Sequence, residues 1–185
     1  MMVELPDFLL NTLRSKADDI LKDPKSFDQQ RYNDHLVGHI KQEYQITVDP
    51  DFTNFLEFLG KEYQQRFHMM PDRSLKLQDL WINLQRKHEF NPFHNHDGKL
   101  SFVIWVNIPY ELDDELQVFA ESRDNRTSKF EFMYLSALGH TCTLSLPVSK
   151  EWEGRLCMFP SSMLHSVNPF YTSDGVRVSV SGNLS

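Results

Sequence analysis

Three histidines and one arginine are the residues of this chain whose types and spacing could do chemistry. His94 and His96 are separated by a single residue. His165 follows about seventy positions later, and Arg177 lies near the chain end. On an extended segment, residues i and i+2 point to the same side, so His94 and His96 can direct two imidazoles toward one point. This spacing indicates a metal-binding site.

A third nitrogen from His165 would complete one face of the coordination shell of a metal. The opposite positions would stay open for a substrate, oxygen or a chelating cosubstrate, and open positions are typical of catalytic metals. Arg177 belongs to an alternating run in which Ser179 and Ser181 share its strand face. A guanidinium fork beside a hydroxyl can hold a carboxylate. The pattern therefore predicts a metal centre with an anion-binding arginine nearby.

Two motifs around these residues resemble those of the iron(II)/2-oxoglutarate-dependent oxygenases, in particular small prolyl-hydroxylase-like proteins of bacteria and tailed phages. The first motif is Asn-Pro-Phe-His-Asn-His at residues 91–96, followed by Leu100-Ser101 and a hydrophobic strand. The second motif starts at Phe159-Pro160-Ser161 and continues through His165, Pro169, Arg177, Ser179, Ser181 and Asn183. The resemblance covers roughly residues 76–185, and a weaker similarity extends to the segments around His35 and Glu43.

This resemblance implies a double-stranded β-helix, or jelly roll, and a dioxygenase that uses Fe(II), 2-oxoglutarate and O2. His94, His96 and His165 would then hold the metal. Arg177 would bind the far carboxylate of 2-oxoglutarate, with help from Ser179. The expected reaction is hydroxylation of an unactivated C–H bond, and by analogy the first candidate for the target is a prolyl residue in a peptide or protein.

The ligand motif departs from the usual pattern at one position. Family members carry a carboxylate two residues after the first histidine, and this chain has His96 there. The nearest carboxylate, Asp97, falls on the opposite face of an extended chain. The Asp97-Gly98 pair is a good turn former, so a turn could bring Asp97 to the metal. We favour three histidines, because residues two apart on a strand share a face without any turn.

Two other functions are compatible with the motifs. A cupin-like metalloenzyme would bind iron, manganese or zinc with three histidines and would not use 2-oxoglutarate. The glutamate that cupins usually carry after the histidine pair is missing from residues 97–100. A jelly-roll binding module with a vestigial metal site would have no activity, and His96 at the carboxylate position supports that alternative. Metal analysis combined with 2-oxoglutarate turnover separates the three functions.

The composition favours a single domain with a substantial core. The chain has 185 residues, of which 40% are hydrophobic and fourteen are Phe. The net charge of -7 argues against a broad phosphate-binding surface and so disfavours nucleic acid as a partner. Cys142 and Cys157 form no Cys-x-x-Cys pair and are expected to be free thiols. Nothing in the pattern indicates an oligomeric state.

No apolar run reaches membrane length, and the first residues do not form a basic region followed by an apolar stretch. We therefore expect no membrane partner. The expected location is the cytoplasm, which would be the host cytoplasm if a phage encodes the chain. The expected ligands are 2-oxoglutarate and an unidentified peptide, protein or small-molecule substrate.

Apolar residues at helical spacing predict helices over most of the first seventy residues, with stretches near 8–21, 36–44 and 50–67. Asp49-Pro50 is typical of a cap followed by proline at the first helical position. From Leu75 onward the alternation predicts strands near 76–85, 100–108, 115–121, 129–135, 140–147, 154–159, 163–168 and 175–183. These elements predict one domain, residues 1–185, with a helical support region (1–72) packed on the outer face of a jelly-roll core (73–185).

Other residues near the motifs have no assigned role. Asn83 and Asn91 flank the paired histidines, and one face of the following strand carries Ser101, Val103, Trp105 and Asn107. Each of these side chains could line the site or could satisfy buried backbone groups. Four further histidines are expected at surface or structural positions, namely His35, His39, His68 and His140.

Overall fold

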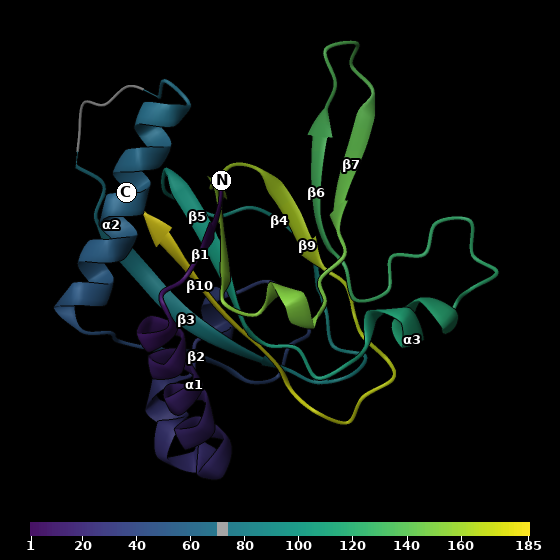
Figure 1. The fold of residues 1–185 in the computed structure, drawn as a ribbon, viewed down its shortest axis with the longest axis horizontal. Helices are drawn as coiled ribbons and strands as arrows, with labels where there is room; N and C mark the ends of the chain where they lie inside the picture. Colours follow the sequence, from purple (N-terminus) through teal and green to yellow (C-terminus); the bar gives the residue numbers. More distant parts are fainter. Residues whose placement is uncertain (70–73) are drawn as a thin grey trace.

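The computed structural model describes residues 1–69 and 74–185, and two antiparallel β-sheets dominate it (Figure 1). The larger sheet has the strand order β1 (Met2–Glu4), β8 (Arg155–Pro160), β5 (Leu100–Asn107), β10 (Arg177–Leu184), β3 (Leu77–Gln85) and β2 (Glu43–Gln45). The smaller sheet has the order β4 (Asn91–His94), β9 (Leu164–Val167), β6 (Phe130–Leu135) and β7 (Thr141–Leu146). The remaining elements are α1 (Asp7–Lys22), α2 (Pro50–Arg66) and α3 (Leu112–Gln117), with short 3-10 helices η1 (Pro24–Gln30), η2 (Asn33–His35) and η3 (Lys150–Trp152).

Strand β5 explains how the layers are held together, because it is buried on both faces. Val103 and Trp105 point toward the smaller sheet and pack with Phe130 in the core between the sheets. The alternate residues of β5 belong to a second core, which helices α1 and α2 form against the outer face of the larger sheet. A strand covered on both sides carries a continuous apolar run, as residues 102–106 do.

Helix α2 begins as its sequence predicts. The Asp49 side chain accepts a hydrogen bond from the backbone N–H of Phe52 at 2.8 Å, and Pro50 occupies the first helical position. A cap of this kind typically contributes about 1 kcal/mol to stability. Phe52 and Leu56 are fully buried on the face that contacts the sheet. The helix therefore covers the larger sheet and leaves the inner face of that sheet free to line a site.

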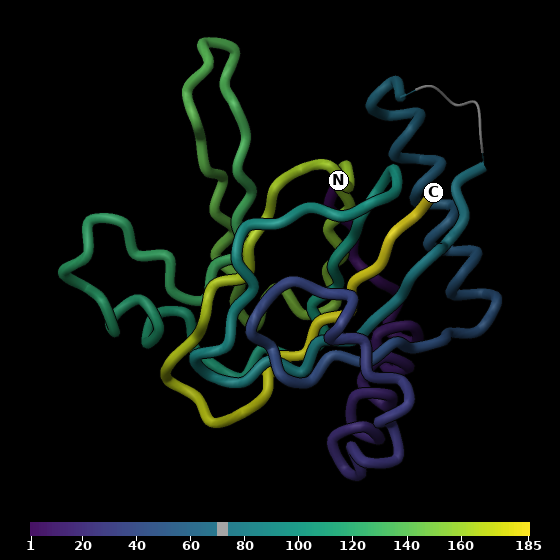
Figure 2. Tube along the Cα trace, turned by 180° about the vertical axis from the view of Figure 1, so that it is seen from behind, coloured from purple at the N-terminus to yellow at the C-terminus, as the bar shows by residue number. Residues whose placement is uncertain are grey.

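Two expected elements were wrong. Residues 36–44 are not a helix: Gly38 has a φ of +145°, and β2 starts at Glu43. These residues instead form an irregular segment that leads into β2 and crosses the middle of the molecule (Figure 2). The expected strand at 115–121 is replaced by α3 and a turn, because the fully buried Glu115 carboxylate accepts the backbone N–H groups of Tyr171 and Thr172.

The other expected strands after residue 75 correspond to β3, β5, β6, β7, β8, β9 and β10. Strands β1 and β2 arise from the region expected to be helical and extend the larger sheet at its two edges. The expected boundary between residues 72 and 73 lies outside the described residues. Within the part of the chain that the structure describes, no helix combines the length and the apolar character needed to cross a membrane.

The β6–β7 hairpin projects away from the rest of the molecule (Figure 1). Its base is anchored because β6 pairs with β9, where Phe132 lies opposite His165. Its tip is free of such pairing, and Leu135 and Leu138 are strongly exposed there. The hairpin therefore has a fixed base next to His165 and an exposed apolar tip.

Candidate metal centre

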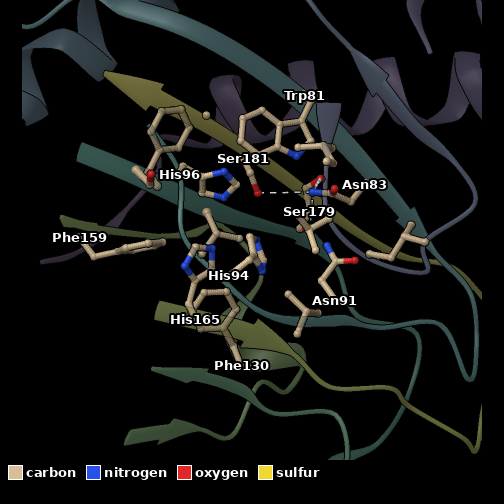
Figure 3. Close-up of a pocket in the computed structure, with 18 residues that line it drawn as sticks. Trp81, Asn83, Asn91, His94, His96, Phe130, Phe159, His165, Ser179 and Ser181 are labelled. Atoms are coloured by element: carbon tan, nitrogen blue, oxygen red, sulfur yellow. Dashed lines mark hydrogen bonds between the residues drawn. The ribbon is translucent and has the colours of Figure 1, made fainter. Parts of the chain in front are cut away.

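Three imidazoles converge in the space between the two sheets (Figure 3). His94 ends β4 and lies directly opposite His165 of β9 in the strand register, and His96 follows two residues after His94. One ring nitrogen from each residue can be chosen so that all three lie within 4.8 Å of one another. The structure thus brings together the three histidines that the sequence predicts to meet.

Two of these rings are oriented by the backbone. The Nδ1 atom of His94 lies 2.7 Å from the carbonyl oxygen of Pro92, and Nδ1 of His165 lies 3.0 Å from that of Met163. A carbonyl can only accept a hydrogen bond, so Nδ1 carries the proton in both residues. This leaves the Nε2 lone pair of each ring for a metal, as in the usual arrangement in which a second partner fixes the tautomer.

Burial keeps the three imidazoles neutral at physiological pH. Desolvation lowers the pKa of His165 to about 3 and that of His96 to about 4, and it also lowers the pKa of His94. The charges of neighbouring histidines add to the effect for His165 and His96. A metal binds the neutral imidazole, so protons compete only weakly for these ligands near neutral pH.

Asp97 is outside the group of possible ligands. The described residues contain one cluster with metal-ligand spacing, and it consists of the three histidines. The backbone N–H of His96 donates to the carbonyl of Ser161 at 3.0 Å, and Gly98 adopts a positive φ of +104° before β5 begins. The chain does turn after His96, but Asp97 is exposed on that turn. The geometry therefore favours His96 over Asp97 as the third ligand.

The histidines line a small pocket whose free space is about 30 Å³, room for roughly two water molecules. Trp81, Ser179 and Ser181 form part of the wall on the side of the larger sheet (Figure 3). Leu36 and Val37 contribute from the segment that the sequence assigned to a helix.

Ser179 and Arg177 have different surroundings although they share a strand face. Ser179 lines the pocket, where its hydroxyl accepts a hydrogen bond from Asn83 at 3.2 Å. Arg177 is only 4% exposed and does not line the pocket. Its guanidinium donates to four oxygen atoms at 2.7–3.0 Å, which belong to Gln85, Tyr110, Ser128 and Asn168.

The buried charge of Arg177 has only neutral partners. Within residues 1–69 and 74–185 no carboxylate forms an ion pair with it. Buried charges are normally paired, because removing them from water is costly. Four of the five guanidinium N–H groups are engaged, so one N–H group has no acceptor among the described residues.

Some wall residues were not predicted. Of the residues near the motifs that had no assigned role, Asn83, Asn91, Ser101 and Val103 line the pocket, whereas Trp105 and Asn107 do not. Trp81 was missed, although strand alternation places it on the same face as Asn83. The position of Leu36, Val37 and Ile40 in the pocket wall could not be predicted from sequence, because their apolar spacing fits a helix as well as an irregular segment.

Comparison with known families and structures identifies relatives of the fold. A family model described as "Putative 2OG-Fe(II) oxygenase" matches residues 79–183. This range includes every residue to which the sequence analysis assigned a role. No curated protein matches the sequence significantly.

Two solved structures resemble the whole chain. A prolyl-4-hydroxylase from Pseudomonas putida matches with a TM-score of 0.61 at 15% identity, over 100% of this chain and 90% of its own. The viral collagen prolyl hydroxylase of Paramecium bursaria Chlorella virus-1, in its 2OG complex, matches with a TM-score of 0.58 at 9% identity. The match covers 100% of this chain and 94% of the viral chain. At these identities the likeness shows the fold, and the predicted jelly roll with helices on its outer face is confirmed.

Proposed function

The chain belongs to the 2OG-Fe(II) oxygenase family, and we propose that it hydroxylates an unactivated C–H bond at the centre formed by its three histidines. Fe(II), 2-oxoglutarate and O2 are the cofactor and cosubstrates of this family. The observation that supports the site is the convergence of three neutral imidazoles on one point in a partly enclosed pocket. Family membership favours this activity over a cupin-like enzyme or an inactive binding module.

The donor set fits an iron(II) ion. His94 and His165 present Nε2, and the ring of His96 lies 4.9 Å and 5.1 Å from theirs, centroid to centroid. Imidazole nitrogen is a suitable ligand for iron, and three facial ligands leave positions free for other groups. Bound iron would supply the activation of O2 that is coupled to oxidative decarboxylation of 2-oxoglutarate to succinate and carbon dioxide.

Arg177 is proposed to attract the far carboxylate of 2-oxoglutarate, with Ser179 as a hydroxyl partner on the same strand face. The argument is electrostatic, because a buried guanidinium with only neutral acceptors gains from an anion that approaches its remaining N–H. The four existing bonds hold the guanidinium in place before the cosubstrate arrives. Ser179 lies between Arg177 and the histidine side of the pocket along β10.

A prolyl residue in a peptide or protein is the proposed target. Four Trp and Phe side chains line the pocket, namely Trp81, Phe102, Phe130 and Phe159 (Figure 3). Flat apolar walls exclude water and suit a small apolar ring. The two structural relatives are themselves named as prolyl hydroxylases. The pocket contributes apolar contact and water exclusion, and the histidines contribute the position of the metal.

Anaerobic addition of Fe(II) and 2-oxoglutarate to the protein is expected to produce a weak visible charge-transfer band, because 2-oxoglutarate would coordinate an iron ion held by His94, His96 and His165. Admission of O2 should then release succinate. Absorption spectroscopy and succinate assay measure the two steps. Metal binding without the band would instead favour the cupin-like enzyme, and absence of metal binding would favour the inactive module.

The choice of third ligand is tested by comparing two neighbouring substitutions. His96→Ala is expected to weaken metal binding far more than Asp97→Ala, because only the first removes an atom from the convergent group. His96→Asp should retain Fe(II) binding, since it creates the usual His-x-Asp spacing of the family. Titration with Fe(II) under anaerobic conditions measures all three. The opposite order for the two alanine variants would assign the site to Asp97.

A further inference from the structure

The three-histidine centre contains no negatively charged ligand. Imidazole binds a metal as the neutral ring, so a divalent ion held by these three residues would keep its full charge inside a partly buried pocket. An unbalanced charge in such surroundings is unfavourable unless a carboxylate lies nearby. A carboxylate on the inner face of a strand next to the pocket would offset that charge.

Asp79 of β3 occupies the required face. Residues alternate along a strand, so Asp79 points to the same side as Trp81 and Asn83, which both line the pocket. The ring of Trp81 lies 5.4 Å from that of His96. Asp79 is the next residue on this face beyond Trp81, and it is partly buried.

The neighbouring strands place Asp79 close to the segment that carries His96. Asp79 lies opposite Asn183 in the strand register, and the Asn183 side chain accepts a hydrogen bond from Ser101 at 2.8 Å. Ser101 is also bonded to Ser161, whose carbonyl accepts the backbone N–H of His96.

Tyr32 holds the Asp79 carboxylate. The Tyr32 hydroxyl donates to Oδ1 of Asp79 at 3.1 Å. The tyrosine ring is itself packed between His35, at 4.8 Å, and Trp81, at 5.8 Å. Burial and the Asp79 carboxylate both raise the pKa of Tyr32, so the hydroxyl keeps its proton and remains a donor. One carboxylate oxygen is thereby fixed, and the other is left without a hydrogen-bond donor among the described residues.

We propose that Asp79, held by Tyr32, balances the charge of the three-histidine centre from outside its ligand shell. Asp79 is a positioning and charge-balancing residue here, since its oxygens are not part of the convergent ligand group. Asp79 supplies, from β3, the negative charge that family members with a carboxylate at the position of His96 have within the ligand set. The inference rests on the proposed metal site, and it assigns to that site a residue outside both sequence motifs.

The test is a metal titration of the full chain with Co(II) under anaerobic conditions, followed by its visible absorption. Asp79→Asn is expected to weaken Co(II) binding about 10- to 100-fold, the range typical of losing an outer-shell carboxylate. Asparagine can still accept the Tyr32 hydrogen bond, so the melting temperature of the metal-free protein should not change. Asp97→Asn, which removes an exposed carboxylate next to the ligand, is the matched control and should have a smaller effect.

A double substitution separates charge balance from a merely structural role. In a His96→Asp background the ligand shell has its own carboxylate, so Asp79→Asn should cost much less affinity than it does in the original chain. An equal loss in both backgrounds, or an Asp79→Asn effect no larger than that of Asp97→Asn, overturns the inference while the metal site stands. Failure of the unsubstituted chain to bind Co(II) overturns the proposed metal site and this inference together.

Discussion

Replacing His165 by alanine is expected to abolish Fe(II) binding and, with it, succinate formation. His165 is only 4% exposed, and its ring is 4.3 Å from that of His94 and 5.1 Å from that of His96. Loss of a direct ligand should exceed the roughly 10- to 100-fold loss that is typical for an outer-shell partner. Anaerobic Fe(II) titration and a coupled succinate assay measure the two effects.

A matched control is His140→Ala, which removes an imidazole from the β6–β7 hairpin and should leave iron binding unchanged. His165 also packs against Phe159, with ring centroids 4.9 Å apart, so its loss could disturb the core. His165→Gln fills more of the space and tests this point, because it should restore the melting temperature but not the metal affinity. Iron binding within about twofold of the original in both variants would exclude His165 as a ligand.

Arg177→Lys is expected to weaken 2-oxoglutarate binding by roughly 30- to 100-fold, equivalent to about 2–3 kcal/mol for a lost charge-assisted hydrogen bond. Lysine keeps the charge, but its three donors cannot maintain four bonds and still meet an anion. The same change should lower the free energy of unfolding, because at least one buried acceptor near Gln85 or Tyr110 loses its donor. Metal affinity should not change, because the guanidinium does not line the metal pocket.

The two effects of this substitution are measured separately. Titration of the Fe(II)-loaded protein with 2-oxoglutarate follows the charge-transfer band, and chemical denaturation gives the free energy of unfolding. Arg126→Lys is the control, since Arg126 is a half-exposed arginine that pairs with Asp124 and with Glu131, and lysine keeps the charge for both carboxylates. A loss of stability with unchanged 2-oxoglutarate affinity would make Arg177 a structural residue and remove it from the cosubstrate site.

The parts of the fold with a regular period were predictable from sequence. Strand β10 alternates between polar and apolar residues, and Asp49-Pro50 marks the start of α2 with a side-chain cap that the structure contains. The convergence of His94 and His96 also followed from local geometry, because residues two apart on an extended segment point to the same side. No local rule connects His165 to residues about seventy positions away, so its assignment as a ligand was weaker from the pattern alone and was strengthened by the resemblance to a family.

The remaining features depend on contacts distant in sequence. Leu36 and Val37 have helical spacing, yet they cover the pocket, because Gly38 and the pairing of β2 with β3 prevent a helix. Glu115 had the appearance of a strand residue, but its carboxylate is needed by backbone groups near Tyr171. Asp79 gave no sign of a role, because its relation to His96 runs through neighbouring strands. In each case a tertiary contact overrides the local pattern.

The short pairing between β4 and β9 makes the affinity of the metal centre a property of the backbone as well as of its ligands. The pairing joins Asn91 to Val167 and His94 to His165, with an irregularity between them, and within residues 1–69 and 74–185 β4 pairs with no strand other than β9. A metal ion that binds both His94 and His165 requires β4 to be paired with β9. If forming this pairing costs free energy, the observed affinity for the ion is lowered by that amount. Stabilising the pairing of β4 with β9 should therefore raise metal affinity without any change to a ligand. Substitutions that weaken the hydrogen bonds between these strands should lower metal affinity, as the loss of a ligand would.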